Sequence, residues 1–192
     1  MSAIEGTKAR AIQEARGLLQ DFGFNGFSFQ HIADALGIKK PSLYDHFKSK
    51  EALGLDLLED YTRSFALWMK TIEIFEPKDK VGALFELFYQ YAGDHRKVCP
   101  VSALTADYNS LPKSMRKPLA QMVKVRHDWL QGVIEEGQKK KAFRADLSAE
   151  KLADLVQSIA LGSQLIARAS NNPEKIREFK LQAYQILEGG KS

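Results

Sequence analysis

The chain has 192 residues, of which 44% are hydrophobic, so it can bury a real core as one domain or as two small ones. Its 28 basic and 24 acidic side chains give a net charge of +4, which permits a polyanionic partner without requiring one. The single cysteine, Cys99, excludes an intrachain disulfide, and the lack of a signal core or of about 20 consecutive apolar residues favours a cytoplasmic protein that does not cross a membrane.

The first predicted helix covers residues 6–22, where apolar side chains recur at spacings of three and four. Gly23 follows as a residue that can adopt the left-handed conformation at a helix end. A short second helix begins after Ser28, which can act as its N-cap, and ends at Gly37. His31 stands where a capping box has Glu or Gln, so the sequence predicts that this box is incomplete.

The third predicted helix opens at Pro41, whose missing N–H costs little in a first turn, and runs to about Phe47. The second and third helices are related by a specific spacing. Ala33 is small where two helices cross, Gly37 supplies the turn, and Leu43 can anchor the third helix on the second. This is the spacing of a helix-turn-helix, and an ordinary pair of core helices is the alternative.

Two lysines favour the helix-turn-helix interpretation. Lys39 and Lys40 stand at the N-terminus of the third helix, where the positive end of the macrodipole disfavours a cation. A DNA phosphate nearby would offset that cost. The residue pattern therefore indicates a segment that lies in a DNA groove.

Helical spacing continues to the end of the chain, without a strand pattern, an internal repeat or a low-complexity tract. We therefore predict an all-α protein with about nine helices. After the third helix, the predicted helices cover about residues 50–74, 77–96, 101–108, 113–137 and 148–170, and a last one ends near residue 187.

Residues 7–58 strongly resemble the N-terminal DNA-binding domain of TetR-family transcriptional regulators. The most specific match is Leu-Tyr-x-His-Phe-x-Ser-Lys-Glu-x-Leu, which this chain carries from Leu43 to Leu53. The resemblance implies a helix-turn-helix DNA-binding domain over residues 1–50, with the helix-turn-helix itself at about 28–47. It also implies a helical ligand-binding and dimerisation domain over residues 51–192. The other matching positions are Ile12 to Gly23, Phe27-Ser28, Ile32-Ala33 and Gly37-Ile38.

The resemblance further implies a homodimer whose two recognition helices enter successive major grooves of a palindromic operator in double-stranded DNA. Lys40 and Pro41 would face base edges, with Gln30 reaching in from the preceding helix. Lys39 stands where family members often have a small or polar residue, so we expect it to strengthen nonspecific binding at the expense of selectivity. The residues that would hold phosphates are Ser42, Tyr44, His46 and Lys50. Tyr44 and His46 can instead be ordinary exposed polar residues, and Gln30 need not contact a base.

In proteins of this kind the C-terminal part binds a small-molecule effector and forms the dimer. Ligand sites are mostly apolar with a few placed polar groups, and core packing is the alternative for each candidate. Small residues near the end of the chain would let the last two helices pack closely with those of a second chain, or within the same chain. The ligand candidates are Trp68, Tyr89, Tyr108, Arg126, His127 and Trp129, and the small residues are Ala160, Gly162, Ser163 and Ala167.

The cysteine has two interpretations. His95 lies four residues before Cys99, and an imidazole near the sulfur would favour the thiolate. Some regulators that this chain resembles sense oxidants or electrophiles through a cysteine. Cys99 is therefore either such a sensor or a buried, inert thiol.

No motif in the sequence indicates an enzyme, a metal site or a cofactor. The four histidines lack metal-binding pairing, and neither a phosphate-binding glycine loop nor a nucleophile elbow is present. We therefore predict a DNA-binding transcriptional repressor that a small molecule releases from its operator. The alternatives are an activator, a regulator switched by Cys99, and a small-molecule-binding helical protein without a specific DNA function.

Overall fold

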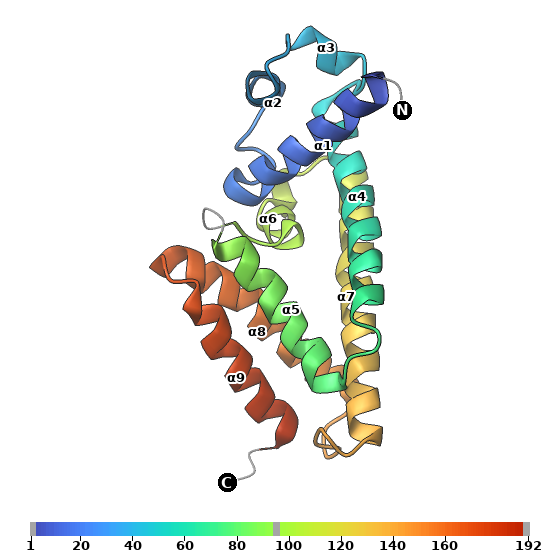
Figure 1. Cartoon of the computed structure of the whole chain (residues 1–192), viewed down its shortest axis with the longest axis vertical. Helices are drawn as coiled ribbons and strands as arrows, with labels where there is room; N and C mark the ends of the chain where they lie inside the picture. Colours follow the sequence, from blue (N-terminus) through green and yellow to red (C-terminus); the bar gives the residue numbers. More distant parts are fainter. Residues whose placement is uncertain (1–2, 94–96, 190–192) are drawn as a thin grey trace. The chain divides into compact units, whose positions relative to one another are not determined.

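The computed structural model describes residues 3–93 and 97–189, and all regular structure in these two ranges is helical, which confirms the predicted fold class. None of the helices in this part of the chain is long and apolar enough to cross a membrane. The described residues form nine α-helices and one short 3-10 helix, η1 (Figure 1): α1 Ala3–Phe22, α2 Phe29–Leu36, α3 Pro41–Tyr44, α4 Lys50–Thr71, α5 Pro77–Gly93, α6 Pro100–Ala106, η1 Tyr108–Ser110, α7 Lys113–Lys139, α8 Ala149–Ser170 and α9 Glu174–Glu188.

The third helix is shorter than predicted, because α3 ends at Tyr44 and not near Phe47. The N–H of Phe47 still donates to the carbonyl of Leu43 (2.9 Å), so the backbone makes one more turn after the regular helix. The chain must then leave the helix, since the Oγ of Ser49 caps α4 by accepting from the N–H of Ala52 (3.1 Å). So short a helix depends on tertiary contacts to stay in place.

The end of α4 also differs from the prediction. The helix stops at Thr71, and the N–H of Phe75 bonds to the carbonyl of Ile72 (3.1 Å) in a tight turn. This turn is needed because Pro77 opens α5, and the residue before a proline avoids the helical conformation. The predicted end of the next helix at residue 96 lies outside the described residues.

The chain divides into two compact units, which do not follow the boundary that we predicted at residue 50. The first unit comprises Met1–Ala66 and Pro100–Met122, and the second comprises Leu67–Cys99 and Val123–Ser192. Both α4 and α7 begin in the first unit and end in the second. The functional division at residue 50 stays a prediction.

In the first unit, α1 packs against both α2 and α6 (Figure 1). The first turns of α7 brace α4, because a Cβ on Gly54 would lie 2.6 Å from the Cε of Met115. These helices share an apolar core, into which α3 contributes the buried Leu43. The fully buried side chains of this core include Ala11, Ala15, Leu19, Ile32, Ala33, Leu43, Leu53, Leu57, Leu104 and Met115.

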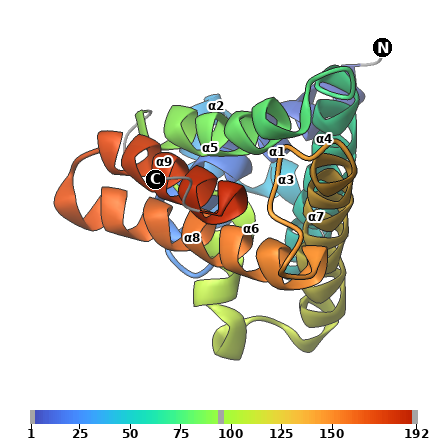
Figure 2. The same cartoon turned by 90° about the horizontal axis from the view of Figure 1, so that it is seen from below.

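The second unit contains an antiparallel hairpin of α8 and α9, with α5 packed against both helices (Figure 2). Asn171 adopts the left-handed conformation (φ 51°) that ends α8, and the chain then turns back into α9. Gly82 lets α9 approach α5 closely, since a Cβ there would lie 2.3 Å from the hydroxyl oxygen of Tyr184. The buried side chains of these helices include Leu84, Phe85, Phe88, Val156, Ala160, Ile176, Ala183 and Leu187.

Candidate nucleic-acid interface and ligand-binding residues

The turn between α2 and α3 has the geometry of a helix-turn-helix, as the spacing predicted. Gly37 has a φ of 65°, which favours glycine, and its N–H donates to the carbonyl of Asp34 (3.2 Å). The N–H of Ile38 donates to the carbonyl of Ala33 (3.0 Å), which closes the end of α2. Leu43 is fully buried and anchors α3 in the core of the first unit.

The side chains predicted to meet base edges are exposed around this turn. Lys39, Lys40 and Pro41 are all exposed, and neither lysine forms an ion pair within the described residues. Gln30 is exposed on α2, but its amide donates to Oδ1 of Asp34 (2.7 Å), so it must exchange this bond to reach a base. Lys39 and Lys40, which form no ion pair within the described residues, therefore lie at the start of α3, where the backbone N–H groups add partial positive charge.

The residues predicted to hold phosphates differ in how freely they can do so. Tyr44 is 53% exposed, and its ring packs edge-on against Phe29 with the centroids 5.1 Å apart. Ser42 and His46 are half-buried on either side of it in the sequence. The structure thus brings these side chains to one short segment, and their roles stay predictions.

Lys50 is already engaged within the first unit. Its Nζ donates to the carbonyl of Phe27 and lies 4.8 Å and 4.5 Å from the ring centroids of Phe24 and Phe27. Burial lowers the pKa of Lys50, and the negative charge of Asp107 partly opposes that shift. Lys50 therefore ties the first turn of α4 to the turn before α2, and its predicted phosphate contact would come in addition to this structural role.

Asp107 supports the turn between α1 and α2, and the sequence did not identify it. The Oδ2 of Asp107 accepts hydrogen bonds from the N–H groups of Phe24 (2.7 Å) and Asn25 (3.4 Å), which fixes the turn between α1 and α2. No local pattern could indicate this contact, because its partners are separated by more than 80 residues.

The prediction of an incomplete capping box at the start of α2 was wrong. The Nδ1 of His31 accepts from the N–H of Ser28 (3.2 Å) and so replaces the expected carboxylate or amide.

Replacing Asp107 with alanine should destabilise the first unit, because it leaves two backbone N–H groups without their acceptor. We expect a loss of about 1–3 kcal/mol in the free energy of unfolding, together with weaker DNA binding. Thermal unfolding measures the first effect and a DNA-binding titration the second. Glu59→Ala is the matched control, since Glu59 is an exposed acid of the same unit, and an equal loss in both variants would contradict the role given to Asp107.

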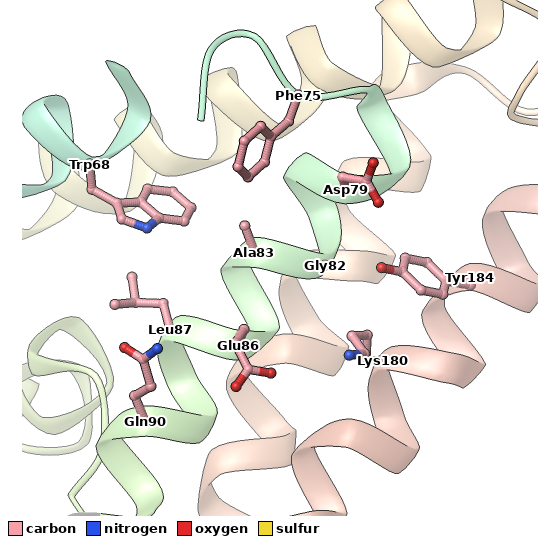
Figure 3. A pocket seen from close by; sticks show the side chains of 10 residues that line it. All are labelled: Trp68, Phe75, Asp79, Gly82, Ala83, Glu86, Leu87, Gln90, Lys180 and Tyr184. Atoms are coloured by element: carbon pink, nitrogen blue, oxygen red, sulfur yellow. The ribbon is translucent and has the colours of Figure 1, made fainter. Parts of the chain in front are cut away.

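The second unit contains an open pocket of about 500 Å³ beside α5 (Figure 3). Trp68 and Phe75 approach from one side of α5, and Lys180 and Tyr184 of α9 approach from the other. Of the predicted ligand residues, Trp68 lines this pocket. The ring of Trp129 packs edge-on against the ring of Trp68, with the two ring centroids 5.3 Å apart. The other lining residues are Asp79, Gly82, Ala83, Glu86, Leu87 and Gln90.

Three other predicted ligand residues have partners elsewhere. The hydroxyl of Tyr89 donates to Oε1 of Glu174 (2.6 Å), and this bond raises the pKa of Tyr89. The Nε2 of His127 lies 3.1 Å from Oδ1 of Asp154. Tyr108 belongs to the first unit, so the structure does not group it with the other candidates. Ligand binding by these residues stays a prediction.

Arg126 and Cys99 come together in the interior of the second unit. Arg126 is only 4% exposed, and its Nη1 donates to the Sγ of Cys99 (3.6 Å). The Nε of Arg126 donates to Oε1 of Gln157 (3.3 Å), and the N–H of Cys99 donates to Oε1 of Gln164 (2.5 Å). His95, the predicted partner of Cys99, lies outside the described residues.

The small residues of α8 were predicted to pack closely against helices of a second chain or of the same chain. Ala160, Ser163 and Ala167 are buried within the same chain, which was the alternative interpretation, while Gly162 is half-buried. Apolar side chains are exposed elsewhere on these helices. They are Leu155, Leu165 and Ile166 on α8 and Leu181 on α9, each between 44% and 59% exposed.

Comparison with known proteins gives matches over both parts of the chain. Residues 11–57 match the family model of the bacterial regulatory proteins of the tetR family, and residues 77–182 match that of the tetracyclin repressor-like C-terminal domain. The chain is 25% identical over 172 residues to the HTH-type transcriptional repressor DhaR of Mycobacterium sp. (strain GP1), with 86% of this chain and 84% of DhaR covered.

Solved structures show the same fold. A TetR-family transcriptional regulator from Agrobacterium tumefaciens superposes with a TM-score of 0.90 at 22% identity, over 96% of this chain and 98% of the other. A TetR transcriptional regulator from Legionella pneumophila gives a TM-score of 0.84 at 28% identity, over 94% and 96% of the two chains. The likeness therefore extends through both compact units.

Proposed function

Because the chain belongs to the TetR family of bacterial transcriptional regulators, we propose that it works as a homodimeric repressor, which a small molecule releases from a palindromic operator. The family consists of DNA-binding regulators and not of enzymes. Its members bind DNA operators and small-molecule ligands as dimers. The operator contacts, the dimer face and the ligand response described below are proposals for this chain.

The start of α3 carries the proposal. Lys39 and Lys40 are exposed cations without an ion pair in the described residues, and the buried Leu43 fixes the turn from which they project. A free lysine in the major groove can pair with the O6 and N7 of guanine, while a lysine beside the backbone neutralises phosphate. Exposed positive charge on a rigid helix-turn-helix is the combination that operator binding needs.

The α3 helices of two chains must be held at a fixed distance, because one short α3 contacts too few bases to specify a DNA site. The exposed apolar side chains of α8 and α9 support a dimer through these helices. Leu155, Leu165 and Ile166 flank the half-buried Gly162 on α8, and Leu181 is exposed on α9. Two copies of this helix pair would form a four-helix bundle across a two-fold axis.

An effector can act on DNA binding through the helices that belong to both units. The α4 helix starts beside the DNA-binding segment and ends at Thr71 in the second unit, where Trp68 lines the pocket. The α7 helix likewise has residues in each unit. A ligand in the second unit shifts the equilibrium only if it binds the released conformation more tightly than the DNA-bound one.

Replacing Leu165 with glutamate should separate the proposed dimer, because it places a charge in an apolar interface. We expect the dimer dissociation constant to rise by about 100-fold or more, and operator affinity to fall with it. Light scattering after size-exclusion chromatography measures the first effect. Ala145→Glu, which adds the same charge at an exposed position between α7 and α8, should leave the dimer intact. A Leu165→Glu protein that stays dimeric would place the interface elsewhere.

A gel-shift experiment with the DNA that flanks the chain's own gene tests the proposed function. The folded dimer should bind one fragment at moderate salt in the presence of competitor DNA, with an affinity about 1,000-fold or more above its nonspecific binding. Failure of the folded dimer to bind any such fragment would overturn the proposal.

A further inference from the structure

Arg126 is a buried cation that lacks a counter-charge within the described residues. Its side chain is on α7, the residue is 4% exposed, and a guanidinium group does not lose its proton in proteins. Neither of the partners that the structure shows is a carboxylate: Nε donates to the amide oxygen of Gln157 at 3.3 Å, and Nη1 donates to the sulfur of Cys99 at 3.6 Å. The Nη2 atom is buried with no hydrogen-bond partner in the described part of the chain.

This arrangement is costly for a protein without a ligand. A buried charge is normally paired and hydrogen-bonded, because removing it from water costs several kcal/mol. Two buried polar side chains of α8, Ser163 and Gln164, have partners within the chain. The Oε1 of Gln164 accepts from the N–H of Cys99 (2.5 Å), and the Oγ of Ser163 donates to the carbonyl of Ala160 (2.8 Å). Within the described residues, no carboxylate pairs with the Arg126 guanidinium, so the group that would complete its contacts is an anion.

The unused donors define the kind of anion. A guanidinium group has five N–H bonds, and the edge formed by Nη1 and Nη2 matches the two oxygens of a carboxylate. The aromatic surface nearest along the helix is Trp129, three residues after Arg126 and so on the same side of α7. Trp129 packs against Trp68, so an apolar ligand body has an aromatic pair to contact.

We propose that Arg126 binds the carboxylate group of the effector, and that the effector is an organic carboxylic acid with an apolar body. The proposal rests on the proposed function, since it identifies the ligand class of the same regulator. The carboxylate accepts from Nη1 and Nη2 of Arg126, and the body lies toward Trp129. The pocket beside α5 offers the acid group a weaker site, because Asp79 and Glu86 line it together with a single lysine, Lys180.

The position of Arg126 in the chain explains how such a ligand affects DNA binding. Residues 113–122 of α7 belong to the first unit, and Arg126 follows them within one helical turn of Met122. Cys99, which Arg126 contacts, directly precedes α6. Asp107, just after α6, holds the backbone of Phe24 in the turn before α2. A carboxylate that draws Arg126 away from the Cys99 sulfur therefore acts on two of the three chain segments that connect the units, namely α7 and the segment from Cys99 into α6.

Thermal unfolding of the full-length protein tests this assignment without knowledge of the natural effector. The probes are sodium formate and sodium benzoate, with sodium chloride and benzamide as the matched controls, at a constant ionic strength of about 0.2 M. Both carboxylates should raise the unfolding midpoint of the wild-type protein above its value in chloride by about 2 °C or more, and benzamide should not. Arg126→Met should abolish the increase, whereas Lys124→Met, which removes an exposed charge from the same helix, should retain it.

The ligand-free variants supply a second readout. If Arg126 is unpaired, Arg126→Met should unfold at the same temperature as the wild-type protein or higher, because it removes an uncompensated buried charge. A midpoint more than about 3 °C lower would mean that the chain itself pairs with Arg126, and the proposal would be overturned. Cys99→Ala should keep the carboxylate response, because the proposed carboxylate bonds to Arg126 and not to the sulfur, so loss of the response in that variant would also overturn the proposal.

Two further outcomes separate the possible failures. Sulfate or phosphate could raise the unfolding midpoint more than formate does, through an effect that Arg126→Met abolishes. That result would identify the ligand of Arg126 as a tetrahedral anion and would overturn the proposal. No difference between formate and chloride in the wild-type protein would overturn it as well. Neither result bears on operator binding by the ligand-free dimer, so a failed gel shift refutes the proposed function independently.

Discussion

Replacing Phe47 with alanine should abolish operator binding and lower the unfolding temperature of the protein. Phe47 is 2% exposed, its ring centroid lies 6.3 Å from that of Phe29, and the Nζ of Lys8 lies over the Phe47 ring at 5.6 Å from its centroid. Deleting a buried phenyl group costs about 3–5 kcal/mol, which corresponds to roughly 10 °C for a chain of this size. The four-residue α3 cannot hold its own conformation after this loss.

Tyr44→Ala is the matched control for Phe47→Ala. Tyr44 is an aromatic residue three positions earlier, but it is 53% exposed, and its ring makes an edge-to-face contact with Phe29. This variant should weaken DNA binding while its unfolding midpoint changes by only a few degrees. Thermal unfolding and DNA titration of the two variants should therefore separate the role of Phe47, which anchors α3 in the core, from the proposed role of Tyr44 in contacting DNA. Equal stability losses, or a Phe47→Ala protein with normal operator affinity, would contradict this assignment.

Replacing Lys40 with alanine should weaken operator binding and change the base preference. Each lost base contact costs about 1–3 kcal/mol, and a dimer loses two of them, so the total is about 2–6 kcal/mol. Titration of the operator and of single-base variants by fluorescence anisotropy measures both effects. Stability should not change, because Lys40 is exposed and unpaired in the described residues.

Lys48→Ala removes the same charge from an exposed site after α3 and is the control for Lys40→Ala. It should lower affinity for all DNA sequences by a similar, smaller factor, because only the electrostatic contribution is lost. If Lys40→Ala also lowers affinity uniformly, Lys40 contacts phosphate and the base-reading role must pass to another residue of the turn.

Local patterns in the sequence predicted most of the helices and the helix-turn-helix, because their determinants lie within a few residues of one another. Gly37 and Leu43 are examples: the first needs only its own backbone conformation, and the second only its place on one side of a helix. The end of α3 was predicted too late. The pattern of apolar residues continues to Phe47, but the regular helix ends at Tyr44. The chain leaves the helix there because Ser49 acts as the N-cap of α4.

The missing parts of the site depend on contacts between distant segments. Asp107 supports a turn more than 80 residues earlier in the chain, and Lys50 bonds to the carbonyl of Phe27. Arg126 was predicted as a polar ligand residue, but only the structure shows that it is buried beside Cys99. Tyr108 was grouped with it on composition alone, although it folds into the other unit. Spacing along a helix carries no information about such partners.

Footprinting of the full-length dimer on the fragment that it shifts tests most directly whether two copies of α3 read DNA together. The account predicts two protected half-sites, related by two-fold symmetry and centred about one helical turn of DNA apart or a multiple of it, with protection of the major groove in each. Protection should disappear for Leu165→Glu and be retained for Ala145→Glu. A single asymmetric protected segment, or uniform protection without a boundary, would contradict it.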